Sequence, residues 1–297
     1  MNLYKYVDMP GLLRVLDGGI RFTQPGAFND PFELLPEIYV PEGTQEEEIS
    51  IGFDLYGPRR SDLLDCMPLG YERGFCNDIQ SRDILRDLNG RIGIFCMSKN
   101  NDSLLMWSHY ADQYSGAVIE FDTDHDFFKG LIEVEYSKLR PQKSVNYYIY
   151  SETPIPIAEL CVKSDVWAYE AEYRIVRDLR DCTCVGRCNG FDVYVSSVPV
   201  ECIKSICLGE RSSVLSQREV WGRLKDTNIA MSLAAISNCG FEFRWDHIKG
   251  NSPIGDGVPD MTPRTAHIFK DEVGSYGDFA RFVIENHPLS PYANILA

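Results

Sequence analysis

Short apolar segments alternate with polar ones along the whole chain, and their spacing predicts both strands and helices. Residues 3–7 favour a strand, and Asp8, Pro10 and three nearby leucines predict a capped helix that ends before Gly18 and Gly19. Alternating or continuous apolar segments predict further strands at 20–23, 92–98, 117–122, 132–136, 170–176, 191–195, 203–209, 229–236 and 241–248. Helical spacing predicts helices at 103–111, 211–225 and 276–285.

The order of these elements indicates an α+β protein, because strands outnumber helices and the helices fall between groups of strands. Residues 24–33 are too rich in Pro, Gly, Asn and Asp for a regular element. Residues 41–90 are weakly periodic, and we expect a helical insertion there with helices near 44–54 and 78–89. The sequence therefore predicts a main domain over 1–250 and a C-terminal appendage over 251–297.

The composition is typical of a folded globular protein. With 297 residues and 44% hydrophobic residues, the chain has ample material for a large core. The net charge of -15 repels nucleic acid, and the longest basic cluster is Pro58-Arg59-Arg60. No apolar signal core or membrane span is visible, so we expect a cytoplasmic protein whose ten cysteines are reduced. No G-x-G-x-x-G or P-loop motif supports a Rossmann or P-loop fold.

Three cysteines lie close together, Cys182, Cys184 and Cys188, in the spacing C-x-C-x3-C. The spacing lacks paired C-x2-C motifs and an obvious fourth ligand, so it favours small buried thiols over a zinc site.

Two carboxylates two residues apart, Glu170 and Glu172, stand at the start of an apolar segment. In a strand, both side chains face the same side, and like charges on one face repel each other. Such a pair is either solvated at an open edge or used in chemistry. Arg174 shares this face and is also consistent with a simple ion pair to Glu172.

Three other clusters combine aromatic, hydroxyl and charged groups. They are Tyr4-Lys5-Tyr6, Phe22-Thr23 with Asn29 to Glu33, and Ser98 with Trp107 to Tyr110. Each also has a structural explanation: Asn29-Asp30-Pro31 is typical of a turn, and Trp107, His109 and Tyr110 are common core residues of a helix.

Three of these segments together resemble the hallmarks of a widespread uncharacterised bacterial family. They are Phe28-Asn29-Asp30-Pro31-Phe32-Glu33, Met106-Trp107-Ser108-His109-Tyr110-Ala111-Asp112, and Trp167-x-x-Glu170-x-Glu172-x-Arg174. The resemblance covers about residues 1–250 and implies no established activity.

The order of elements also resembles, more distantly, the ADP-ribosyltransferase superfamily. That superfamily has three motifs, each on a different strand. Their places correspond here to a first strand with Tyr4-Lys5-Tyr6, a middle strand ending at Ser98, and a later strand beginning with Glu170-Ala171-Glu172. The first motif departs from the usual Arg or His-Gly-Thr, and Ser98 stands alone where Ser-Thr-Ser is usual. The resemblance implies an α+β fold with a split mixed or antiparallel sheet.

That resemblance implies transfer of ADP-ribose from NAD, as substrate, to a protein or nucleic-acid acceptor, or NAD hydrolysis. A carboxylate stabilises the positive charge that forms on the ribose. Glu172 is the candidate for this role, and Glu170 for positioning or deprotonating the acceptor. A toxin or antiphage-defence effector, held by a cognate inhibitor or antitoxin, is the setting that this class implies. The implied NAD-binding residues are Tyr4, Lys5, Tyr6, Arg21, Thr23, Asn29, Asp30, Phe32, Ser98, Trp107, His109, Tyr110 and Arg174.

The sequence leaves two other classes of function open. Asp30, Glu33, His109, Glu170 and Glu172 are the residue types that would hold Mg²⁺ or Mn²⁺ in a nuclease or other hydrolase. A non-catalytic binding module would use His109 and Glu172 only to brace a cleft. Cysteine catalysis ranks last, because no Cys has a His at a recognisable spacing.

Overall fold

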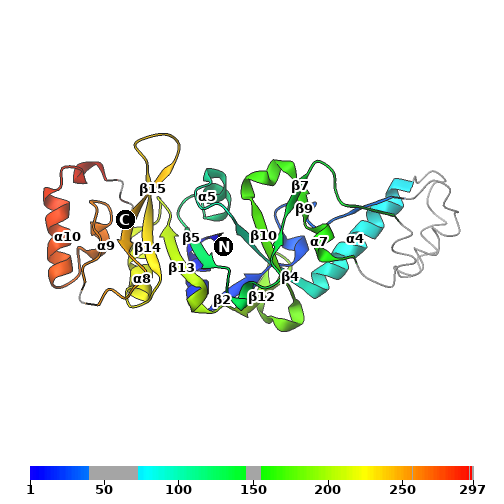
Figure 1. Ribbon diagram of the computed structural model, residues 1–297, viewed down its shortest axis with the longest axis horizontal. Helices are drawn as coiled ribbons and strands as arrows, with labels where there is room; N and C mark the ends of the chain where they lie inside the picture. Colours follow the sequence, from blue (N-terminus) through cyan, green and yellow to red (C-terminus); the bar gives the residue numbers. More distant parts are fainter. Residues whose placement is uncertain (40–72, 145–154, 256, 294, 296–297) are drawn as a thin grey trace.

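The computed structural model describes residues 1–39, 73–144, 155–255, 257–293 and 295. An eight-stranded, mostly antiparallel sheet runs through the middle of an elongated molecule (Figure 1). One neighbouring pair in this sheet, β13 and β14, is parallel. In spatial order its strands are β15 (Phe243–Lys249), β14 (Ala230–Ile236), β13 (Ile203–Leu208), β5 (Ala117–Asp122), β1 (Asn2–Val7), β4 (Ile92–Ser98), β10 (Glu172–Asp178) and β6 (Ile132–Glu133).

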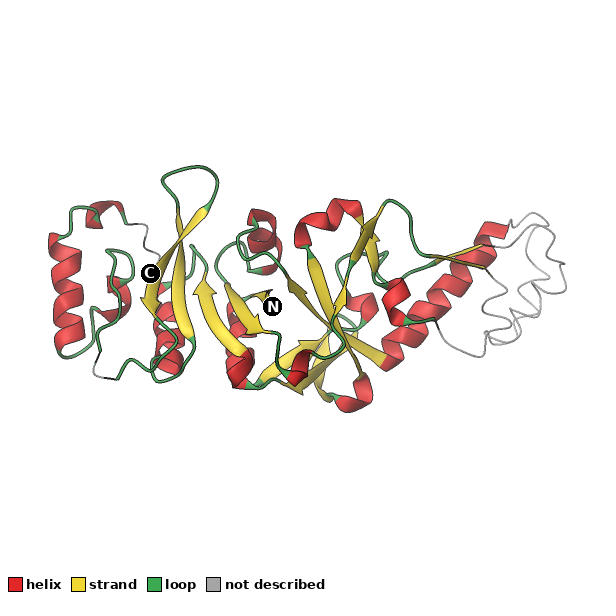
Figure 2. Ribbon diagram, in the orientation of Figure 1, coloured by secondary structure: helices red, strands yellow, loops and turns green. Residues whose placement is uncertain are grey.

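The described residues form three smaller sheets in addition to the main one (Figure 2). A three-stranded sheet contains β11 (Thr183–Cys188), β12 (Phe191–Ser197) and β2 (Gly19–Phe22), and a bridge between Thr23 and Ile94 links it to β4. Two parallel pairs consist of β3 (Glu37–Tyr39) with β8 (Gln142–Ser144) and β7 (Glu135–Ser137) with β9 (Val162–Ser164).

Helices cover the two faces of the main sheet unequally. Leu3 of β1 packs into the large core with α1 (Met9–Leu16) and α8 (Val214–Leu224). Tyr6, on the other face of β1, packs against α5 (Leu104–Tyr110). Because side chains alternate along a strand, α5 lies on the face opposite α1 and α8. Beside β1 this face is covered by the short α5 helix, and both cavities described below open on it.

The cap predicted for the first helix at Asp8 is confirmed, and the structure adds a second one at Ser103. The Asp8 side chain accepts a hydrogen bond from Gly11 N and caps α1, while the Ser103 side chain accepts one from Met106 N and caps α5. These side chains satisfy backbone N–H groups that have no partner inside the helix. The α+β class is likewise confirmed.

The C-terminal segment packs on the helical face of the main sheet. Ala266 and Phe269 of α9 (Ala266–Phe269) belong to the large core, and the Phe269 ring lies 4.9 Å from the ring of Trp221. The predicted helix at 276–285 is α10 (Ser275–Asn286), at one end of the molecule in Figure 1. The described part of the predicted appendage therefore shares its core with the main sheet.

At the other end of the molecule, α4 (Arg73–Arg91) corresponds to the helix predicted near 78–89. Its Asn89 fixes the loop before β3, since Asn89 accepts hydrogen bonds from Gln24 Nε2 and Gly26 N. The helix expected near 44–54 lies outside the described residues. The remaining short helices are α7 (Ile157–Leu160) and the 3₁₀ turns Pro25–Ala27, Asp126–Phe128, Asp165–Glu170, Leu179–Asp181, Val200–Cys202 and Ser290–Tyr292.

Two predicted features near β7 and β11 are wrong. The strand expected at 132–136 is split at Val134, because β6 pairs with β10 whereas β7 pairs with β9. Cys184 and Cys188 are exposed on β11 instead of buried, since the hairpin that carries them lies at a sheet edge. In the described ranges no group of three or more His, Cys, Asp or Glu is arranged to hold a metal.

None of the helices that the structure describes combines the length and the apolar character needed to cross a membrane.

Candidate functional site

The candidate site lies where two neighbouring strands, β1 and β4, separate. Tyr4 of β1 is in register with Ser98 of β4, and Ser98 is in register with Glu172 of β10. Paired residues of neighbouring strands project to the same side, so these three side chains form one row across the sheet. The Tyr4–Ser98 pair is the single register pair that joins β1 to β4 within the described chain.

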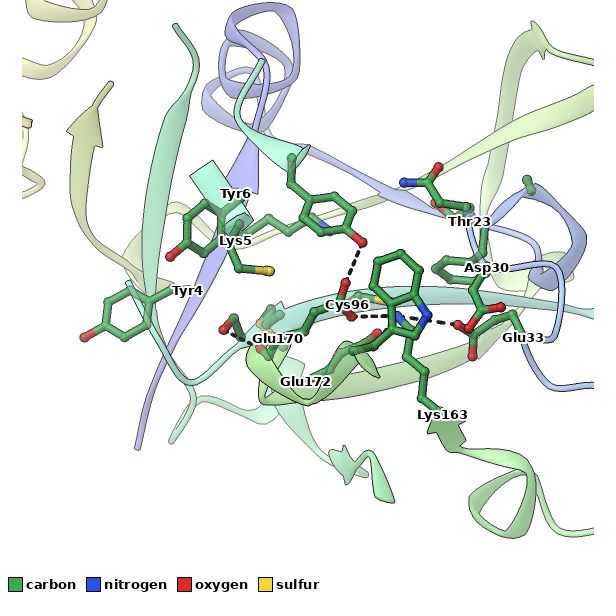
Figure 3. A pocket seen from close by; sticks show the side chains of 18 of the residues that line it. Tyr4, Lys5, Tyr6, Thr23, Asp30, Glu33, Cys96, Lys163, Glu170 and Glu172 are labelled. Atoms are coloured by element: carbon green, nitrogen blue, oxygen red, sulfur yellow. Dashed lines mark hydrogen bonds and ion pairs between the residues drawn. The ribbon is translucent and has the colours of Figure 1, made fainter. Parts of the chain in front are cut away.

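A cavity of about 250 Å³ occupies the opening beside this row (Figure 3). Its wall includes Lys5 and Met97, whose side chains leave β1 and β4 toward the other face of the sheet. The cavity therefore reaches between the two strands. Its lining contains these residues predicted for the site: Tyr4, Lys5, Tyr6, Arg21, Thr23, Asn29, Asp30, Ser98, Tyr110, Glu170 and Glu172.

An ammonium group, Lys163 Nζ, stands at the centre of the acidic side of the cavity. It lies 2.6 Å from Glu170 Oε2, 3.2 Å from Glu172 Oε2 and 3.8 Å from Glu33 Oε2. Its side chain is 7% exposed. Burial works to lower the pKa of Lys163, but the three carboxylates outweigh it and raise that pKa well above its usual value. Lys163 is therefore a permanent cation that holds the carboxylates together.

A second cation, Arg174, lies directly beneath the cavity and is fully buried. Its Nε and Nη2 donate to the two carboxylate oxygens of Glu172 at 2.8 and 2.9 Å, and its Nη1 donates to Glu33 Oε1 at 2.7 Å. Positions 172 and 174 share a strand face, as the sequence predicted. Such a two-pronged contact fixes the orientation of the Glu172 carboxylate.

Glu172 stays ionised because of these two cations. Burial works to raise the pKa of Glu172, but the charges and hydrogen bonds of Arg174, together with Lys163, outweigh burial and lower it to about 2. The backbone N–H of Glu172 donates to the Tyr136 hydroxyl at 2.9 Å, which anchors the start of β10.

Glu33 is the least satisfied member of the cluster. Its side chain is 1% exposed and lines the cavity, yet Oε2 has no hydrogen-bond partner. Burial raises the pKa of Glu33, and the neighbouring Arg174 and Lys163 do not cancel this effect. Three buried carboxylates face two buried cations, so the acidic side of the cavity favours a ligand group that carries positive charge or donates a hydrogen bond.

The prediction that Glu170 and Glu172 share a strand face is wrong. Glu170 ends a 3₁₀ turn, and Ala171 adopts the left-handed conformation, with φ 41° and ψ 56°, before β10 begins. This turn breaks the alternation of a strand. The two carboxylates still meet, because the turn directs Glu170 toward Lys163 from the side while Glu172 points there from the sheet.

Hydroxyl groups position the Glu170 segment. The Tyr110 hydroxyl donates to Glu170 Oε1 at 2.6 Å, and Ser98 Oγ donates to the Glu170 backbone carbonyl at 2.6 Å. Ser98 thus fixes the main chain of the acidic turn. Burial raises the pKa of Tyr110, and the hydrogen bond to Glu170 adds to this effect. The Tyr6 hydroxyl donates to the Asn100 carbonyl at 2.9 Å, which holds its ring at the cavity wall.

Four residues predicted for the site do not line the cavity. Trp107 is fully buried behind Tyr6, because it anchors α5 to the sheet. Phe32 is exposed and lies against Arg140, His109 is exposed beside Tyr169, and Arg174 contacts the cavity through its carboxylate partners alone.

Two cations lie at the cavity away from this cluster. Lys5 packs over the Phe95 ring, with its Nζ 5.3 Å from the ring centroid, and Arg21 is exposed on β2. Neither makes an ion pair to a carboxylate within the part of the chain that the structure describes. Both charges are therefore available to an anionic group of a ligand.

Sequence reasoning missed Lys163 altogether and placed Glu33 in the hydrolase alternative alone. Lys163 lies on a three-residue strand without any periodic pattern, so no local signal marks it. The excess of carboxylates at Glu33, Glu170 and Glu172 was the available signal, because buried carboxylates require a cation nearby.

The depressed pKa of Glu172 predicts a specific acid sensitivity. The carboxyl has a pKa of 4.5 when unperturbed and about 2 in the folded protein, so it stabilises the fold above about pH 4.5. This contribution, of the order of 3 kcal/mol, is lost as the pH falls toward 2. We expect the free energy of unfolding to fall more steeply between pH 5 and 2.5 for the parent than for Glu172→Gln, as measured by urea unfolding. Parallel pH curves would contradict this.

Comparison with known families finds a match over the middle of the chain. Residues 106–175 match the model of a family described as "Protein of unknown function (DUF2971)". The matched segment includes Tyr110, Lys163, Glu170, Glu172 and Arg174, whereas the loop 28–33 lies outside it. No curated protein and no solved structure matches the chain. Over this segment the protein is thus similar to an uncharacterised family.

Proposed function

We propose that this protein cleaves the bond between nicotinamide and ribose in NAD and transfers the ADP-ribose to a macromolecular acceptor or to water. One observation supports this most: Tyr4, Ser98 and Glu172 lie in a single row beside a cavity in an opened sheet. Three segments that lie far apart in the sequence, each expected to carry part of an NAD site, thus line a common cavity.

Glu172 supplies the negative charge that the reaction requires. As the bond breaks, nicotinamide leaves with the bonding electron pair and the ribose carbon becomes positive. A carboxylate that is already ionised and held by Arg174 stabilises this charge without reorganising. A nucleophile of the acceptor then bonds to the ribose carbon, and Glu170 takes the proton released. When water attacks instead, its proton can pass to the solvent.

The charges around the cavity match the two ends of the proposed substrate. NAD carries a cationic pyridinium ring at one end and an anionic pyrophosphate near its middle. The carboxylates of Glu33, Glu170 and Glu172 favour the pyridinium, while Lys5 and Arg21 are free to pair with the phosphates. The rings of Tyr6 and Tyr110 line the same cavity and provide aromatic surface for nicotinamide.

The same geometry argues against a hydrolase that holds a divalent metal at these carboxylates. The Lys163 ammonium already occupies the position among Glu33, Glu170 and Glu172 where a metal ion would bind. Its raised pKa keeps the proton in place, so the carboxylates have a resident counter-ion.

The test is to incubate the protein with NAD labelled on adenine, with and without EDTA, alone and with a cell lysate as a source of acceptors. We expect release of nicotinamide, a labelled product and no inhibition by EDTA. If no nicotinamide is released under any of these conditions, the proposal is wrong. Activity that requires added Mg²⁺ or Mn²⁺ would instead favour the hydrolase.

A further inference from the structure

A second cavity, of about 280 Å³, opens on the same sheet face as the first. Tyr4 lines both cavities, so they adjoin at this residue. The second cavity extends from β1 across β5, β13 and β14 to β15, where Trp245 and His247 line it. It plays no part in the reaction proposed above.

A continuous row of side chains forms the floor of this cavity. Tyr4 is in register with Glu120, Glu120 with Ser205, and Ser205 with Ala230. Paired residues project to the same side, so the Glu120 carboxylate lies directly beside the Tyr4 ring. The Tyr4 and Trp245 rings both pack against the hydrophobic cluster under α5, and each leaves part of its surface in the cavity.

With His247 neutral, the charge of this cavity has one sign. Among its described lining residues, Glu120 is the single carboxylate, and there is no Lys or Arg. Glu120 accepts hydrogen bonds from two neutral groups, Asn2 Nδ2 at 2.6 Å and Ser205 Oγ at 2.5 Å. Its negative charge is therefore fixed in place but not neutralised. Burial, together with this charge, raises the pKa of Tyr4.

An uncompensated carboxylate beside one aromatic ring, in a cavity that a second aromatic ring also lines, is the chemistry that binds an ammonium or guanidinium group. Such cations gain from both the charge and the ring faces. The net charge of -15 adds a long-range attraction for basic partners and repels nucleic acid.

We propose that the second cavity docks a cationic side chain of the protein that accepts ADP-ribose. Glu120 pairs with the cation, and Tyr4 and Trp245 contact its aliphatic stem and its charged end. The shared Tyr4 wall places the neighbouring residues of that acceptor at the first cavity. This assignment of a protein acceptor depends on the proposed function, whereas the cation site can be tested without it.

The test follows the indole N–H signal of Trp245 by NMR in the full-length ¹⁵N-labelled protein, with Trp245→Phe to assign it. The probes are n-butylguanidinium and n-butylammonium, with butyrate and n-butanol as anionic and neutral controls. We expect saturable shifts with both cations and none with the controls. Glu120→Gln retains the shape of the side chain and weakens cation binding at least about tenfold, while Glu201→Gln, at an exposed position, leaves it unchanged.

Equal shifts with butyrate or with a short oligonucleotide would overturn the cation site, and so would unchanged cation binding by Glu120→Gln with an unaltered melting temperature. The NAD assay separates the two proposals. Cation binding without nicotinamide release refutes the reaction and the acceptor role but not the site, whereas nicotinamide release without cation binding refutes the docking proposal alone.

Discussion

Glu172→Gln is expected to lower the rate of NAD cleavage by a factor of at least about 10² to 10³, which is the usual cost of removing one group that stabilises charge in a transition state. Glutamine has nearly the same shape but no charge to oppose the cation that forms on the ribose. Arg174 holds both carboxylate oxygens of Glu172 but a single oxygen of Glu33, so Glu172 is the carboxylate with the fixed orientation. The measurement is nicotinamide release under saturating NAD.

Two variants serve as controls for this prediction. Glu135→Gln makes the same change at an exposed position on β7 and should retain full activity. Glu170→Gln should slow transfer to an acceptor more than NAD hydrolysis, since Glu170 acts on the acceptor proton. If Glu172→Gln is folded and cleaves NAD within about threefold of the parent rate, an electrostatic role for this carboxylate is refuted.

Arg174→Met is expected to destabilise the fold by about 3–5 kcal/mol, because it leaves buried carboxylates without their main counter-ion. Arg174 is fully buried and donates to both Glu172 and Glu33. Methionine fills similar space but donates no hydrogen bond. The measurement is the free energy of unfolding in urea at pH 7, monitored by circular dichroism.

The double variant Glu33→Gln with Arg174→Met tests whether the loss comes from unpaired charge. Removing one of the two unpaired carboxylates should recover part of the stability. The effects of the two substitutions on the free energy of unfolding should therefore not be additive. Arg180→Met is the matched control, because Arg180 also pairs with a carboxylate two residues earlier, Asp178, but is 90% exposed. It should change stability little. Equal stability of Arg174→Met and the parent would contradict this account.

Local signals in the sequence were sufficient for much of the fold. The α1 helix begins at the capping residue that the sequence indicated, and α5 lies within the predicted range 103–111. The strands at 92–98 and 117–122 lie where apolar continuity predicted them. These features depend on contacts within a few residues, which any window of the sequence contains.

The predictions of strands were wrong where a single residue or a distant pairing partner decided the conformation. Ala171 in the left-handed region delays the start of the predicted strand to Glu172, although alanine gives no sequence signal for that conformation. Val134 separates two strands that pair with different partners, which no local pattern records.

By itself, the sequence determined the α+β class, most strands of the main sheet, the helices that begin near residues 9, 104, 214 and 275, and a set of polar residues that belong to separate segments. The tertiary structure alone decided which of these residues meet: it aligned Tyr4, Ser98 and Glu172 across three strands, and it brought Lys163 to the carboxylates. The physical reason is the distance along the chain over which each interaction acts. Periodicity and capping act between neighbours in the chain, whereas a buried charge finds its counter-ion through space, wherever the sheet places one.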